Sequence, residues 1–139
     1  MAVNPLLEPG RIVYYPIDFG GIIGVAPHHI VLVDHREVFF RYFIIKTEPS
    51  PWQKKNKKAL KRFVDIDKSS HPCLRYDSVI YCGELHAERV LKIQQHVREK
   101  PKDLKTKISD SVQAEILKRV AVSDVLSPDE KAAVIAYLG

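Results

Sequence analysis

The chain has 139 residues, of which 45% are hydrophobic and 28% charged, with a formal net charge of +5. This length predicts a single domain with room for a core, and the composition is ordinary for a globular protein. The apolar runs are short, which argues against a membrane span, and the first residues lack the pattern of a signal peptide. Two cysteines do not predict a disulfide scaffold, so we expect a reducing, cytoplasmic setting.

Short segments typical of β-strands fill the first two thirds of the chain. Such segments are rich in Ile, Val, Phe and Tyr and are bounded by Gly, Pro or polar clusters. The continuously apolar segment His29–Val33 predicts a central strand. A glycine-bearing loop is expected at Asp18–Gly24 and a turn at Asp34–Glu37. The expected strands are Arg11–Ile17, His29–Val33, Val38–Lys46, Arg62–Ile66 and Ser78–Cys82.

Helical patterns replace the strand patterns toward the end. The spacing is ambiguous at Val90–Ile93, which fits a short strand or the start of a helix through Val97. Ser109–Val122 has apolar residues at helical spacing, and Ser127–Glu130 is a capping box that opens a terminal helix. Strands followed by helices predict an α+β fold, with a small, strongly bent sheet or barrel and helices packed on one side.

The positive charge of the chain is concentrated in one segment. Six of the nine residues from 54 to 62 are basic and none is acidic. We call these six residues the basic tract: Lys54, Lys55, Lys57, Lys58, Lys61 and Arg62. Trp52 precedes the tract, within a Pro-rich stretch, 48–61, that we expect to be a long loop with a helical turn near Lys57–Lys61. A local positive field beside an aromatic residue favours RNA binding, through phosphates and base stacking, or an acidic protein partner.

The order of these segments resembles the MazF/PemK group of the CcdB/Kid superfamily, toxins of bacterial type II toxin–antitoxin systems. The resemblance rests on Gly10–Asp18, His29–Val33, Phe43–Thr47, Asp77–Cys82 and a C-terminal helix. It implies one SH3-like barrel domain over 1–139, with the barrel at about 9–95 and helices at about 109–138. It further implies a homodimer, an acidic antitoxin partner and a metal-independent endoribonuclease that uses the RNA 2′-hydroxyl as nucleophile, with no cofactor.

The resemblance also assigns candidate site residues. Thr47 matches the Ser or Thr that the family carries at the end of this strand, where it would hold the phosphate. Pro27-His28-His29 stands where the family has Arg-Pro, and Tyr81 and Gly83 stand where some members have Arg and Asp. Without the usual arginine, His28 or His29 would move protons, since histidine titrates near neutral pH. The alternative is a catalytically inactive module that binds RNA or a partner protein.

Two metal-dependent alternatives are weaker. His71, Cys73, Cys82 and His86 are residue types that bind zinc, but their spacing is not that of common zinc motifs. The carboxylates Asp65, Asp67, Asp77 and Glu84 are the residue type of metal-dependent nucleases, yet they equally fit a polar strand face near lysines. The sequence therefore favours a site without metal.

Overall fold

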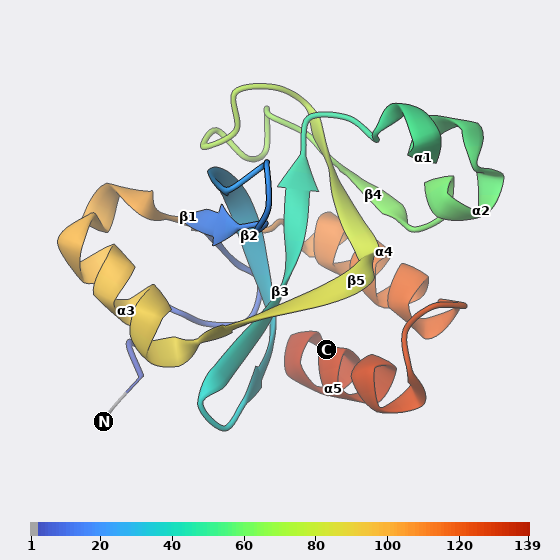
Figure 1. Cartoon of the computed structure of the whole chain (residues 1–139). Coiled ribbons are helices and arrows are strands. Elements are labelled where there is room, and N and C mark those ends of the chain that lie inside the picture. The colour runs from blue at the N-terminus through green and yellow to red at the C-terminus, as the bar shows by residue number, and fades with distance from the viewer. Residues whose placement is uncertain (1–2) are drawn as a thin grey trace.

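The computed structural model describes residues 3–139, which form a mixed α+β fold around an antiparallel sheet. Neighbouring strands pair in the order β4-β5-β3-β2-β1-β6. Figure 1 shows the long strands β2, β3 and β5 crossing the middle of the molecule. The strands are β1 (Arg11–Asp18), β2 (Val25–Arg36), β3 (Phe39–Lys46), β4 (Phe63–Ile66), β5 (Ser78–Arg89) and β6 (Leu104–Lys107).

Helices cover both faces of this sheet. One face packs against α4 (Asp110–Ala121) and α5 (Pro128–Leu138), and the other against α3 (Val90–Glu99). Figure 1 shows α3 on one side of the strands and α4 and α5 on the opposite side. A short 3-10 helix, η1 (Pro101–Asp103), links α3 to β6. The fold therefore has three layers and two cores.

Side-chain alternation assigns the residues of each strand to the two cores. Val31 and Phe43 belong to the core of α4 and α5, whereas their neighbours Ile30 and Ile44 belong to the core of α3. Both sets are almost fully buried, as the continuously apolar pattern of the second strand predicted. The expectation of helices on one side only is wrong, because α3 covers the second face.

Several expected boundaries need correction. The second strand begins at Val25 and continues to Arg36, so the expected turn at Asp34–Glu37 narrows to Glu37 and Val38, with Glu37 at a φ of 55°. The Asp34 carboxylate instead accepts a hydrogen bond from Arg41 Nε across the strand pair, at 2.7 Å. The ambiguous segment that starts at Val90 is helical. Strand β6 was not expected, because Leu104–Lys107 has a single apolar residue.

The stretch expected to be a loop contains two short helices, α1 (Pro51–Lys55) and α2 (Lys57–Leu60). The side chain of Ser50 accepts a hydrogen bond from the Gln53 backbone N–H, and the Gln53 side chain accepts one from the Ser50 N–H. This capping box and the proline at the first helical position explain why a helix begins at Pro51 in a segment so rich in lysine. The same device opens α5 at Ser127, as the sequence predicted.

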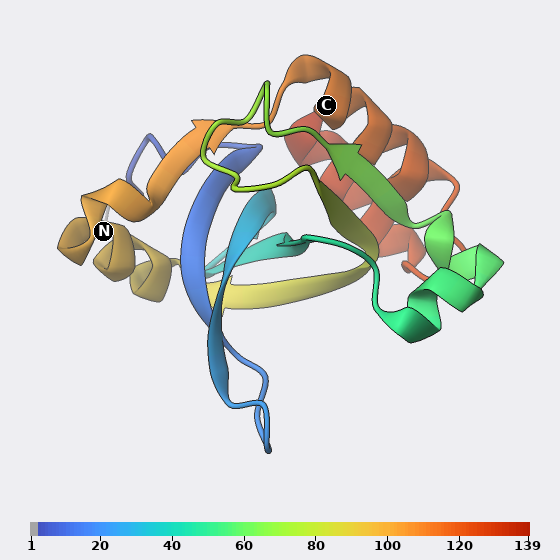
Figure 2. The ribbon, with the colours of Figure 1, turned by 90° about the horizontal axis from the view of Figure 1, so that it is seen from above.

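The six strands do not close on themselves, because β4 and β6 are the two edges of the hydrogen-bonded order. A closed barrel is therefore not confirmed within residues 3–139. Between β1 and β2, the loop projects away from the body of the molecule (Figure 2), and Ile22 at its tip is fully exposed. No helix in the described part of the chain is long and apolar enough to cross a membrane.

The two-core arrangement makes a testable prediction about Phe43. Its ring is fully buried at the centre of β3, so Phe43→Ala leaves a cavity and should lower the free energy of unfolding by roughly 3–5 kcal/mol. Urea denaturation followed by circular dichroism measures the change. Ile22→Ala at the exposed loop tip is the control, and an equal loss for both variants would contradict the assigned core.

Candidate functional site

Three adjoining cavities form a groove beside the 67–77 loop. We call them the basic cavity, of about 880 Å³, the histidine cavity, of about 410 Å³, and the acidic cavity, of about 460 Å³. Tyr14, His29 and Arg75 line both the basic and the histidine cavity. Thr47 and Ser78 line both the histidine and the acidic cavity. The shared residues make the three cavities neighbours, and we call them together the groove.

Strand pairing brings His29 and Thr47 into this groove. His29 in β2 lies opposite Tyr14 in β1, and the two rings are 4.8 Å apart between centroids. Thr47 directly follows the end of β3, the other neighbour of β2. All three expected catalytic residues therefore border the histidine cavity, and Tyr14 joins them.

His28 has a different position. It borders the histidine cavity, but adjacent side chains of a strand point to opposite faces of the sheet, so its ring does not lie beside that of His29. The ring of His28 instead packs edge-on against Phe19, at 5.3 Å between centroids. The two histidines were expected to be interchangeable, and the alternation of β2 makes them inequivalent.

An arginine that the sequence analysis did not single out completes the site. Arg75 belongs to the polar loop between β4 and β5, is exposed, and lines the two cavities that meet at His29. Its guanidinium lies 6.0 Å from the centroid of the Tyr76 ring. The sequence has Tyr81 and Gly83 in β5, where some members of the resembled family carry Arg and Asp, so no arginine was expected at the site. A single arginine in a polar loop carries no sequence signal that would have identified it.

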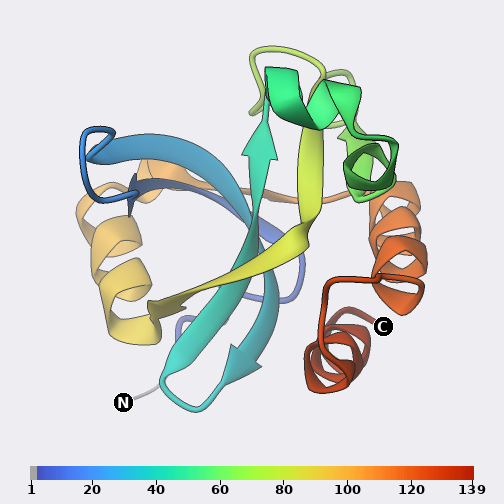
Figure 3. The ribbon, with the colours of Figure 1, turned by 45° about the vertical axis from the view of Figure 1, so that its right-hand side comes forward.

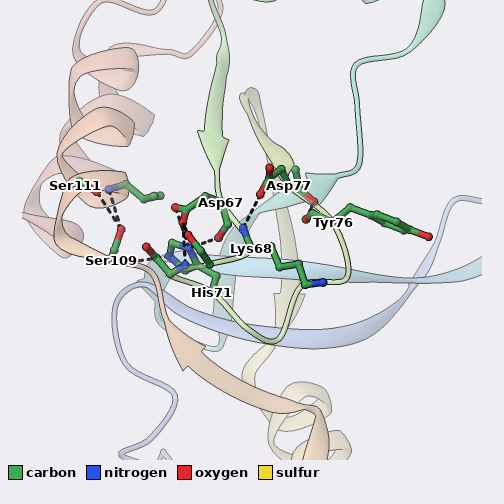
Figure 4. Close-up of polar contacts among 11 residues, drawn as sticks. Asp67, Lys68, His71, Tyr76, Asp77, Ser109 and Ser111 are labelled. Carbon is green, nitrogen blue, oxygen red and sulfur yellow. Dashed lines mark hydrogen bonds and ion pairs between the residues drawn. The ribbon is translucent and has the colours of Figure 1, made fainter.

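His71 holds the 67–77 loop in place. Its fully buried ring accepts a hydrogen bond at Nε2 from the Ser109 backbone N–H, at 2.9 Å, at the residue that caps α4. Nε2 is therefore unprotonated, and Nδ1 carries the proton that it donates to the Asp67 carbonyl oxygen, also at 2.9 Å. Figure 4 shows the ring between Asp67 and Ser109.

Burial and charge both act on His29. Burial lowers its pKa below the ordinary 6.5, and the nearby Lys105 lowers this pKa further, while Asp103 opposes the change and His28 adds a small decrease. The imidazole of His29 is therefore neutral at neutral pH and can accept a proton. A proton acceptor, a threonine hydroxyl, a phenol and a guanidinium thus surround one cavity, which is a set suited to phosphoryl chemistry.

The basic tract lies elsewhere. Lys58, Lys61 and Arg62 line a separate cavity of about 310 Å³ with Arg119 of α4. Arg62 lies 3.4 Å from an Asp124 carboxylate oxygen, and Arg119 donates a hydrogen bond to the Lys61 carbonyl oxygen. Figure 3 shows α1 and α2 at one end of the sheet, above α4. Trp52 is 66% exposed in α1, so its ring is accessible for stacking.

The residues that could have formed a zinc site or a carboxylate metal site do not form a cluster that could bind a metal ion. Both ring nitrogens of His71 are used in hydrogen bonds, and Cys82 is buried in the core of α4 and α5. Asp65, Asp67 and Asp77 do line the acidic cavity together, whereas Glu84 does not. Within residues 3–139, no group of three or more His, Cys, Asp or Glu side chains is placed to hold a metal ion.

Comparison with known proteins assigns the chain to no family. The chain matches no protein-family model, and no curated protein matches it either. The function must therefore be argued from the groove.

Replacing His71 should release the loop that carries Arg75. His71→Leu keeps most of the side-chain volume but leaves the Ser109 N–H and the Asp67 carbonyl unpaired, at about 1–3 kcal/mol each. Urea denaturation should show this loss of stability. His35→Leu, at an exposed position in β2, is the matched control, and equal stability of the two variants would disprove the anchoring role.

The environment of His29 predicts a low titration midpoint. In an NMR titration of the His29 ring carbon-bound proton, the midpoint should lie below 6.5 in the folded chain and near 6.5 in concentrated urea. Between its lowered folded pKa and about 6.5, His29 is protonated in the unfolded chain and neutral in the folded chain. The free energy of unfolding should therefore decrease as pH falls below about 6.5. Lys105→Gln removes a positive neighbour and should move the midpoint upward. An unchanged midpoint in this variant would contradict the assigned cause.

Proposed function

We propose that this chain is a metal-independent endoribonuclease of the toxin type that cleaves single-stranded RNA through its own 2′-hydroxyl. The observation that carries the proposal is the meeting of His29, Thr47 and Arg75 around the histidine cavity. Cleavage of this kind needs a base, an acid and a cation near the phosphate, and needs no metal. Each of these requirements has a candidate in this cavity.

The proposed reaction assigns one role to each group. Neutral His29 takes the proton from the 2′-hydroxyl, whose oxygen attacks the adjacent phosphorus. The bond from phosphorus to the 5′-oxygen breaks, and this oxygen takes a proton that we assign to the Tyr14 hydroxyl. Arg75 neutralises the charge that develops on the phosphoryl oxygens, and Thr47 donates a hydrogen bond to them. The products are a 2′,3′-cyclic phosphate and a 5′-hydroxyl.

The resemblance to MazF/PemK toxins supports the remaining parts of the proposal. In this reading the open sheet is a diverged, strongly bent relative of the SH3-like barrel, the chain forms a homodimer, and an acidic antitoxin binds it. Arg75 would supply from a loop the positive charge that the family takes from another position. The basic tract and Trp52 would add phosphate contacts and base stacking at a distance from the cleavage site.

A catalytically inactive binding module is the second candidate. The observation that favours it is the separation of the basic tract from the groove, since a binding surface around Trp52 does not require His29. In that case RNA or a partner protein would bind the tract, and the groove would have no catalytic role.

Incubation with RNA in EDTA distinguishes the two candidates. We expect cleavage of a mixed-sequence single-stranded RNA and no cleavage of DNA, which lacks the 2′-hydroxyl. His29→Asn should lower the rate by roughly 10²–10⁴-fold, since it removes the base. Arg75→Gln should lower it by roughly 10²-fold or more, since it removes charge stabilisation. Gel electrophoresis of labelled RNA measures both rates.

The controls separate catalysis from folding and binding. His35→Asn removes a histidine from the exposed end of β2 and should leave the rate unchanged. Replacing the lysines of the basic tract with glutamine should weaken RNA binding more than it lowers the rate at saturating RNA. Uncut RNA in every sequence context would refute the enzyme proposal, and RNA binding retained in that case would favour the module.

A further inference from the structure

We infer that the basic cavity is a binding subsite for the RNA on one side of the cleaved bond, so that the protein holds its substrate asymmetrically. The inference rests on the proposed function and names the part of the substrate that this cavity takes. The ligand is a run of consecutive phosphodiesters in single-stranded RNA.

Four cations surround this cavity: Arg75, Lys100, Lys102 and Lys105. In the described chain, none of these four has a carboxylate oxygen within 4.0 Å of its charged nitrogens. Unpaired cations around a concave surface attract a polyanion, because no intramolecular ion pair has to break when a phosphate binds.

The two carboxylates of the cavity already have other partners. Asp103 accepts a hydrogen bond from His96 Nε2 at 2.9 Å, and Glu99 accepts one from the Gln95 side chain at 3.2 Å. His96 also lies 3.0 Å from the Tyr14 carbonyl oxygen, so Asp103 belongs to a contact between η1 and β1. Glu99 and Asp103 are therefore engaged with Gln95 and His96, and the lysines of the cavity are free to bind an external anion.

The other side of His29 differs in charge. Beyond the shared residues Tyr14, His29 and Arg75, the histidine cavity offers Lys46. The neighbouring acidic cavity is lined by Asp65, Asp67 and Asp77 and by Glu48, which is paired with Lys54 at 2.7 Å. Carboxylates repel phosphates, so the part of the RNA that lies on this side of the cleaved bond gains little binding energy from electrostatic attraction. Most of the electrostatic binding energy should therefore come from nucleotides in the basic cavity.

A length series tests this asymmetry without any need for cleavage. Oligonucleotides with 2′-O-methyl groups throughout have no free 2′-hydroxyl and stay intact, and fluorescence anisotropy measures their binding at several salt concentrations. Trimming the oligonucleotide from one end should weaken binding several-fold per nucleotide and reduce the salt slope by about 0.7 per lost phosphate contact. Trimming it from the other end should change both quantities little.

The variant K102Q/K105Q should weaken binding of the full-length oligonucleotide and abolish the difference between the ends. K92Q/K118Q loses the same charge at two exposed positions outside the groove and is the matched control. Equal effects of trimming at both ends, or equal effects of the two double variants, would overturn the inference. Cleavage without this asymmetry would overturn the subsite alone, whereas asymmetric binding without cleavage would overturn the enzyme proposal and support the subsite.

Discussion

The alternation of side chains along β2 and β3 is the constraint on which the rest of the structure depends. Because helices cover both faces of the sheet, the buried apolar residues of these strands must suit one of two cores. A shift of register by one residue would exchange the two sets and place His29 on the wrong face. The same constraint that buries Val31 and Phe43 therefore places His29 beside Tyr14 in the groove, whereas His28 borders the histidine cavity with its ring against Phe19.

Much of the fold could be predicted from local patterns. Strands β1, β3 and β4 and helices α4 and α5 appear at their expected places, because their apolar periodicity and their caps are local properties of the sequence. The extent of β2 and β5 and the existence of β6 could not be predicted. Polar residues such as His86, which lies opposite Tyr42, and Lys107, which lies opposite Arg11, become part of strands only because a neighbouring strand pairs with them, which is a tertiary effect.

The site was predictable only in part, for a related reason. His29 and Thr47 were identified, but the groove is assembled from segments that are distant in the sequence, and the cations that line it are scattered as Lys46, Arg75, Lys100, Lys102 and Lys105. The sequence instead draws attention to the basic tract, where five lysines and one arginine stand within nine residues. Local charge density identified a positive surface and missed the one that the fold creates beside His29.

The anchoring of the 67–77 loop by His71 has a consequence for the dynamics of the protein. One imidazole ring joins the loop that carries Arg75 to the first turn of α4, so breaking its two hydrogen bonds releases both segments together. The loop and the start of α4 should therefore open as one cooperative unit, with matched rates of amide hydrogen exchange. Such an opening would disassemble the groove and expose Leu74 and Val112, which belong to the core of α4 and α5, while the core of α3 stays packed. The integrity of the site therefore depends on one of the two cores and not on the other.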